Sequence, residues 1–301
     1  MKFLTAVYRN ETMIGLLRED EQVVNLTGAA SELGIPFPVT LLEGIQQGEN
    51  FLEQTRQLVE QLNNQDLQNN FTLSVHDIDF LAPIPRPTKN IFCVGKNYRE
   101  HALELGDESD IPEVPMIFSK APTSVIGTNE TIRIPTEVTT EIDYEGELAV
   151  VIGKTGKRIK KESAYDHVFG YTLINDITAR DLQSRHKQFL IGKSLDTSCP
   201  MGPVIVHKSA IQDPQKLSIT THVNGERRQQ SSTEMMIFSI ADLIEDLSKV
   251  MTLEAGDIIA TGTPAGVGKG FKPPKYLKAG DVVSVEVESI GILKNPVQNE
   301  V

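Results

Sequence analysis

Hydrophobic and polar positions along the first quarter of the chain predict a small α+β unit. Residues 2–26 alternate in short runs, as expected of strands with one buried face. Residues 50–62 carry apolar side chains at helical spacing, and Asn50 is expected to cap this helix. A polar run at 63–70 and three prolines within residues 83–87 then interrupt both patterns. The sequence therefore predicts a small N-terminal domain, 1–82, followed by a larger domain, 83–301.

Most hydrophobic runs of the larger domain are short and predict strands. Asn224-Gly225 is typical of a two-residue hairpin turn, and a helix is expected from Ser239 to about Val250. Because few helices separate the strands, the pattern predicts a mostly-β domain and an α+β fold class for the whole chain. The expected strands cover residues 91–94, 116–119, 144–152, 168–175, 204–207, 217–223, 257–261 and 282–287.

Two acidic residues in the run 143–152, Glu145 and Glu147, stand out in this pattern. Strand residues two apart point to the same face, with Cα atoms roughly 6 to 7 Å apart. The run is apolar after Glu147, so two desolvated negative charges would repel each other unless a cation lies between them. A divalent metal would supply that cation. Glu141 and Asp143 continue the same spacing, however, so the solvated face of an edge strand is a second interpretation.

Asp176 is a candidate third ligand, because it follows a run of buried strand residues that begins at Gly170. Three carboxylates favour Mg²⁺ or Mn²⁺. A zinc site would be expected to contain Cys or His at short spacing, and none is present here.

Several ordered segments resemble motifs of the fumarylacetoacetate hydrolase superfamily, over a region from about residue 83 to the C-terminus. Within the superfamily the chain is most similar to the branch of oxaloacetate decarboxylases and acylpyruvate hydrolases, which includes a bacterial oxaloacetate decarboxylase. The resemblance implies a mixed β-roll for the larger domain and a homodimer. The segments that carry it are residues 94–104, 145–147, 175–183, 192–203 and 261–268.

The segment 97–113 is expected to contain a water-activating pair and a lid. His101 and Glu104 lie three residues apart on an expected helix that stops at Gly106, so they share a face. A carboxylate beside an imidazole orients the ring and raises its basicity. An ordinary surface contact would show the same spacing, but the resemblance implies that this His and Glu close over the active site. We therefore predict that 97–113 orders when ligand binds.

Four further residues are assigned from the resemblance and from their chemistry. Lys193 matches the catalytic lysine of the family, whose charge stabilises an enolate. Arg180 is expected either to hold a substrate carboxylate or to form a structural ion pair, and Gln183 resembles a residue that positions substrate or water. Thr263 follows an expected strand, and its hydroxyl and the neighbouring N–H groups are expected to bind the substrate's carboxylate.

Composition limits the partners of this chain. It has 301 residues, a net charge of −12 and a pI near 5.0, which argue against nucleic acid and anionic membranes. Its two cysteines, Cys93 and Cys199, form no CxxC motif. The first ten residues lack the apolar core of a signal peptide, so a cytoplasmic protein is expected.

These observations predict a Mg²⁺- or Mn²⁺-dependent enzyme that decarboxylates oxaloacetate, a small 2-oxo acid, to pyruvate and CO₂ through a metal-stabilised enolate. One alternative is hydrolysis of a C–C bond in an acylpyruvate, because that reaction passes through the same enolate. Another is an interaction protein with secondary catalysis, in which residues 1–82 serve as a docking module.

Overall fold

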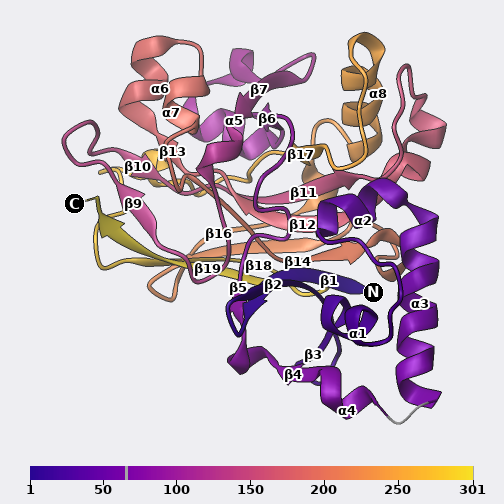
Figure 1. Ribbon diagram of the computed structural model, residues 1–301. Helices are drawn as coiled ribbons and strands as arrows, with labels where there is room; N and C mark the ends of the chain where they lie inside the picture. Colours follow the sequence, from indigo (N-terminus) through magenta and orange to yellow (C-terminus); the bar gives the residue numbers. More distant parts are fainter. Residues whose placement is uncertain (65–66, 301) are drawn as a thin grey trace.

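Two β-sheets form the centre of the computed structural model, which describes residues 1–64 and 67–300 (Figure 1). The larger sheet is antiparallel except for the β17–β6 and β14–β8 pairs. Its main path runs β4 (Thr72–Ser74), β3 (Gln22–Asn25), β2 (Glu11–Leu17), β1 (Lys2–Tyr8), β14 (Cys199–His207), β12 (Val168–Asn175), β11 (Gly146–Ile152), β17 (Ile258–Ala260), β6 (Ile91–Gly95) and β7 (Met116–Lys120), with β5 (Asp79–Phe80) beside β1 and β8 (Val125–Ile126) beside β14.

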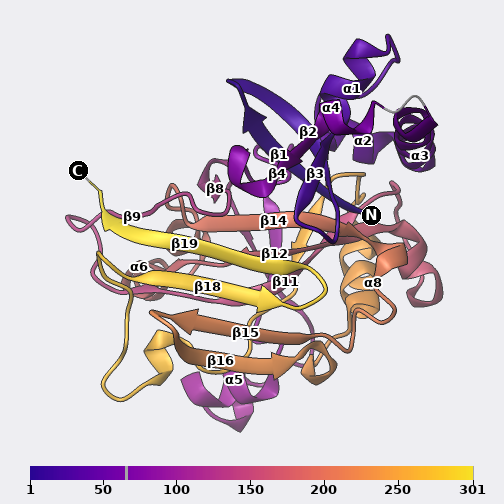
Figure 2. The same cartoon turned by 90° about the horizontal axis from the view of Figure 1, so that it is seen from below.

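A second sheet packs against β11, β12 and β14 of the first (Figure 2). Gly146 lies at this contact: a Cβ there would stand only 2.2 Å from the buried Thr221 hydroxyl. The glycine between two glutamates therefore permits the close approach of the two sheets. This sheet has the order β16 (Glu226–Ser232), β15 (Ser218–Val223), β18 (Val282–Val287), β19 (Gly291–Asn299) and β9 (Ile132–Ile134), and a separate pair joins β10 (Ile142–Asp143) to β13 (Thr178–Ala179).

The helices lie outside the sheets. The helix predicted from Ser239 is α8, and Ser239 forms a capping box with Asp242. The helix predicted to begin at Asn50 instead begins at Glu49, immediately after the turn at Gly48, so Asn50 lies inside it and is not its cap. The helices are α1 (Leu26–Glu32), α2 (Leu41–Gln47), α3 (Glu49–Asn64), α4 (Gln68–Phe71), α5 (Arg99–Leu105), α6 (Arg180–His186), α7 (Leu190–Lys193) and α8 (Ile240–Val250).

The first 82 residues contain the strands and helices expected of a small α+β unit, but they share a sheet with the rest of the chain. Strand β1 pairs with β14, placing Lys2 opposite Val206. Phe3 and Phe51 also belong to the same hydrophobic cluster as Ala149 and Ile205. The division at residue 82 thus stays a prediction, and the surfaces on its two sides form one continuous core. No helix in residues 1–64 and 67–300 is both long and apolar enough to span a membrane.

His207 at the end of β14 makes stability depend on pH. Its Nδ1 accepts a hydrogen bond from the Ser209 N–H, and its ring packs on Phe169. Burial and the nearby N-terminal amine lower its pKa to about 4. The unfolded chain therefore takes up this proton first, and stability should fall as the pH drops from about 6.5 to 4. In urea titrations across this window, the free energy of unfolding of His207→Asn should vary less with pH than that of wild type. Equal variation in the two proteins would contradict the role of His207.

Candidate active site

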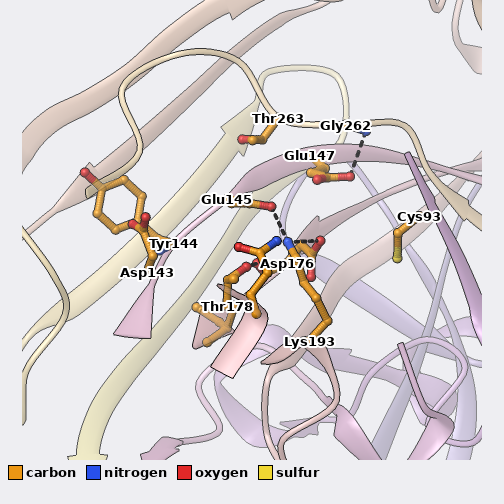
Figure 3. Close-up of polar contacts among 12 residues, drawn as sticks. Cys93, Asp143, Tyr144, Glu145, Glu147, Asp176, Thr178, Lys193, Gly262 and Thr263 are labelled. Carbon is orange, nitrogen blue, oxygen red and sulfur yellow. Dashed lines mark hydrogen bonds and ion pairs between the residues drawn. The ribbon is translucent and has the colours of Figure 1, made fainter. Parts of the chain in front are cut away.

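Glu145, Glu147 and Asp176 converge where β11 and β12 lie side by side (Figure 3). One carboxylate oxygen from each lies within 4.8 Å of the other two, and all three residues are buried. Glu145 stands just before β11 rather than inside the predicted strand, because its N–H bonds to the Asn175 side chain at 3.0 Å. These three carboxylates, the acidic triad, were all predicted from sequence. Their burial excludes the solvated edge-strand interpretation.

Lys193 of α7 lies between two members of the triad. Its ammonium group is 2.6 Å from Glu145 Oε2 and 2.7 Å from Asp176 Oδ2 (Figure 3). Burial opposes its charge, yet the Asp176 and Glu145 carboxylates outweigh burial and raise the pKa of Lys193. Lys193 therefore keeps its proton and forms part of the candidate site, as predicted.

Arg180 forms buried ion pairs at the start of α6. Its Nε lies 2.9 Å from Asp143 Oδ2, and one terminal nitrogen lies 2.7 Å from Glu145 Oε1. A third contact reaches Gln183 Oε1 at 3.3 Å. The arrangement matches the structural ion pair considered from sequence, although Arg180 and Gln183 also line the cavity. Their binding of substrate stays a prediction.

The residues around the triad fit a divalent cation. Burial disfavours a charge on Glu145, but Lys193 and Arg180 prevail and lower its pKa to about 2. Burial, Asp176 and Glu145 instead raise the pKa of Glu147 well above its usual range. Among the residues that the structure describes, Glu147 forms no ion pair, and its Oε2 accepts only the Gly262 N–H at 2.8 Å. Glu147 is thus a buried carboxylate without a cationic partner in the described part of the chain, next to two other carboxylates. Three carboxylate ligands, which offer only oxygen atoms, suit Mg²⁺ or Mn²⁺.

His101 and Glu104 pair on α5 as the spacing predicts. His101 Nδ1 lies 2.7 Å from Glu104 Oε1, which leaves Nε2 for other partners. Glu104 Oε2 also accepts the Gly266 N–H at 2.9 Å, so this side chain ties α5 to the loop after β17. The predicted lid segment is thus docked on the site in this structure, and its ordering on ligand binding stays a prediction.

Thr263 lies in the loop between β17 and the 3₁₀ helix η7 (Gly268–Gly270). Its hydroxyl donates to Gly146 O at 3.0 Å and accepts from Gln229 Nε2 at 2.7 Å. The loop's own N–H groups bond mainly to protein carboxylates: Gly262 to Glu147, Gly266 to Glu104, and Gly268 and Lys269 to Asp143. Thr263 lines the cavity, but its predicted contact with a substrate carboxylate is untested.

Sequence reasoning missed Lys120 and the role of Asp143. Lys120 is fully buried at the end of β7, 2.8 Å from Asp176 Oδ1 and 3.0 Å from the Ile177 carbonyl oxygen. Asp143 is equally buried, and it holds Arg180 as well as the η7 loop. An acidic residue at the same spacing as Glu145 was the only signal for Asp143, and nothing in the local sequence indicates Lys120.

A cavity of about 320 Å³ opens above the triad. Seven of the predicted residues line it, and Asp176 and Glu104 contact lining residues through Lys193 and His101. The residues that line it include Lys96, His101, Leu105, Met116, Phe118, Glu145, Glu147, Arg180, Gln183, Lys187, Phe189, Lys193, Thr263 and Lys269.

Comparison with known protein families shows to which family the chain belongs. The family model described as "Fumarylacetoacetate (FAA) hydrolase C-terminal" matches residues 90–298. The chain belongs to the fumarylacetoacetate hydrolase family. Oxaloacetate tautomerase YisK of Bacillus subtilis is 56% identical over 300 residues, covering 99% of this chain and 100% of that relative. The family resemblance and the α+β fold class predicted from sequence are therefore confirmed.

Solved structures of this family share the whole fold. A fumarylacetoacetate hydrolase from Exiguobacterium antarcticum is 40% identical with a TM-score of 0.83, and both chains are covered completely. A 5-carboxymethyl-2-hydroxymuconate delta-isomerase from Mycobacterium smegmatis is 31% identical with a TM-score of 0.74, again over all of both chains. One fold in this family thus carries both hydrolases and isomerases, so its chemistry must be argued from the site.

Proposed function

We propose that this fumarylacetoacetate hydrolase family member interconverts the keto and enol forms of oxaloacetate. The observation that carries this proposal is a buried lysine, ion-paired to two carboxylates, and a His–Glu pair beside three buried carboxylates around one cavity. The 56% identity with an oxaloacetate tautomerase supports this reaction more directly than decarboxylation. Decarboxylation of oxaloacetate to pyruvate and CO₂ remains the second candidate, because it needs the same stabilised enolate.

The protein's own residues account for the proton movements. Because Glu104 occupies Nδ1 of His101, Nε2 can take a proton from C3 of the keto form. The electron pair left at C3 forms the C2–C3 double bond, and the oxygen on C2 takes a proton from solvent to give the enol. Lys193, which keeps its proton, provides positive charge for the developing oxyanion. Return of the proton to C3 reverses the reaction.

Glu145, Glu147 and Asp176 would hold the metal. A divalent cation bound there supplies a Lewis acid that polarises the 2-oxo group. The protein's contribution is to keep three carboxylates together against their repulsion, with Arg180 fixing Glu145 and Lys120 fixing Asp176. We propose Mg²⁺ or Mn²⁺ as the ion.

His101→Asn separates the two candidate reactions. With Mn²⁺ present, wild-type protein should speed the loss of the enol form of oxaloacetate, followed by ultraviolet absorbance, above the rate with Mn²⁺ alone. The variant should be slower by roughly 10² to 10⁴-fold, because the group that carries the proton to and from C3 is gone. Pyruvate release, measured in parallel, tests decarboxylation, which does not require a base at C3.

His222→Asn is the matched control, because His222 lies on β15 outside the cavity lining. Wild-type protein that leaves the enol–keto rate at the metal-only background would refute the tautomerase proposal. Cleavage of acetylpyruvate that requires His101 would instead support the acylpyruvate hydrolase. If wild-type protein showed no activity in the enol–keto, pyruvate-release and acetylpyruvate assays, the interpretation as an interaction protein would be favoured. The homodimer stays a prediction that light scattering after size-exclusion chromatography can test.

A further inference from the structure

Two exposed lysines line the cavity without an ionic partner. Lys187 ends α6, and Lys269 lies in η7. Within residues 1–64 and 67–300, neither forms an ion pair. We call Lys187 and Lys269 the mouth lysines, because they lie at the solvent-exposed part of the cavity, whereas Lys193 lies at its buried end.

The other cations of the cavity are already neutralised. Lys193 and Arg180 share the carboxylates of Glu145, Asp176 and Asp143, and Lys96 pairs with Asp110. The remaining positive charge of the cavity is therefore concentrated at the mouth lysines. In a chain with a net charge of −12, such a local excess of cations attracts a small anion that the protein as a whole would repel.

The backbone beneath Lys269 is fixed by Asp143, and the backbone of Lys187 has an unusual conformation. The Lys269 N–H donates to Asp143 Oδ2 at 3.0 Å, and the neighbouring Gly268 N–H donates to Asp143 Oδ1 at 2.6 Å. Lys187 has φ 58° and ψ −40°, a conformation that side chains with a Cβ rarely adopt and that glycine tolerates. Lys187 shares this positive φ with eight other non-glycine residues that the structure describes, so its place in the cavity lining, and not its backbone conformation, supports a role in binding.

We propose that the mouth lysines bind a second carboxylate of the substrate, so that the site selects 2-oxo dicarboxylates over 2-oxo monocarboxylates. This inference rests on the proposed function, because the 2-oxo acid end must bind near the acidic triad. Leu105, Met116, Phe118 and Phe189 line the same cavity and suit a short carbon chain. Lys187 and Lys269 thus determine specificity, whereas the triad and Lys193 serve the chemistry.

Two unreactive ligands isolate the second carboxylate. N-oxalylglycine carries an oxalyl head and a distal carboxylate, and N-ethyloxamate has the same head with a methyl group in place of that carboxylate. Binding of each to the Mn²⁺-loaded full-length protein is measured by titration calorimetry. Lys187→Met and Lys269→Met should each weaken N-oxalylglycine by roughly tenfold, and the double variant by more, since charge-assisted contacts are lost. N-ethyloxamate should change by less than about twofold.

Two further variants keep the test sharp. Lys294→Met removes the same charge from an exposed position on β19, outside the cavity lining, and should alter the binding of neither ligand. Lys187→Gly should weaken N-oxalylglycine as Lys187→Met does while unfolding at the same or a higher temperature, because glycine relieves the positive φ.

The possible failures are distinguishable. If wild-type protein binds N-ethyloxamate as tightly as N-oxalylglycine, or if the double variant weakens both equally or neither, the second-carboxylate site is refuted and the proposed function stands. If wild-type protein binds neither ligand, the 2-oxo acid chemistry of the site is wrong, and the inference fails with it.

Discussion

Glu147→Gln is expected to abolish tight binding of Mn²⁺ and to reduce turnover of oxaloacetate by at least about 10²-fold. The amide has nearly the same shape and can still accept the Gly262 N–H, so the local hydrogen bond survives. Only the charge that a cation would neutralise is removed. Titration calorimetry with Mn²⁺ measures the first effect, and the enol–keto assay measures the second.

Without metal, Glu147→Gln is expected to preserve or increase stability, although it reduces metal binding and turnover. The raised pKa of Glu147 means that its ionised form destabilises the fold increasingly as the pH rises above the usual carboxyl range. At pH 8 and without metal, Glu147→Gln should therefore unfold at the same or a higher temperature than wild type. Mn²⁺ should then stabilise wild type alone.

Glu141→Gln is the control for this prediction, because Glu141 has the same spacing but lies outside the triad. If Glu141→Gln also abolished Mn²⁺ binding, the loss would reflect the removal of any nearby negative charge and not of a metal ligand. Tight Mn²⁺ binding by Glu147→Gln itself would remove the triad as the metal site.

Lys193→Met should reduce turnover by roughly 10²-fold or more, because it removes the buried positive charge available to an enolate. It also leaves Glu145 and Asp176 without the ammonium group that joins them. Breaking a buried ion pair in this way costs about 3 to 5 kcal/mol. Without metal the variant should unfold at a clearly lower temperature than wild type, and Mn²⁺ should recover more stability in the variant than in wild type.

Scanning fluorimetry with and without Mn²⁺ measures this difference beside the turnover assay. Lys193→Arg should restore more of the stability than of the activity, since its planar guanidinium keeps the charge but not the compact shape of the ammonium group. Wild-type turnover by Lys193→Met would refute the role of Lys193 in the reaction.

Sequence reasoning succeeded where a local pattern carries the information. The two-residue spacing brought Glu145 and Glu147 together, although Glu145 lies just before β11, and the three-residue spacing joined His101 to Glu104. In the same way, the residues 224 and 225 form the turn between β15 and β16. These features depend on neighbours in the chain, so the rules of strand, helix and turn geometry were sufficient.

It failed where a long-range contact decides the outcome. Lys120 has the local sequence of an ordinary strand end, and only the fold brings it to Asp176. Asp143 looked like one member of an acidic face, yet three N–H groups and Arg180 enclose it. Asn50 is a different case, because a local turn at Gly48 starts the helix before Asn50 can cap it. Capping preferences are weak enough for such a neighbouring turn to override them.

The pairing of β1 with β14 also sets an order of events during synthesis. Strand β1 pairs with β2 along its length, but Lys2 and Phe3 meet Val206 and Ile205 only after about 200 further residues have been made. Until β14 has been made, this part of the β1 edge has no strand beside it and can pair wrongly. The Met1 carbonyl also accepts a hydrogen bond from the His207 N–H. Residues joined before Met1 would therefore lie beside the β1–β14 pairing. A tag joined directly before Met1 is therefore expected to disturb this pairing.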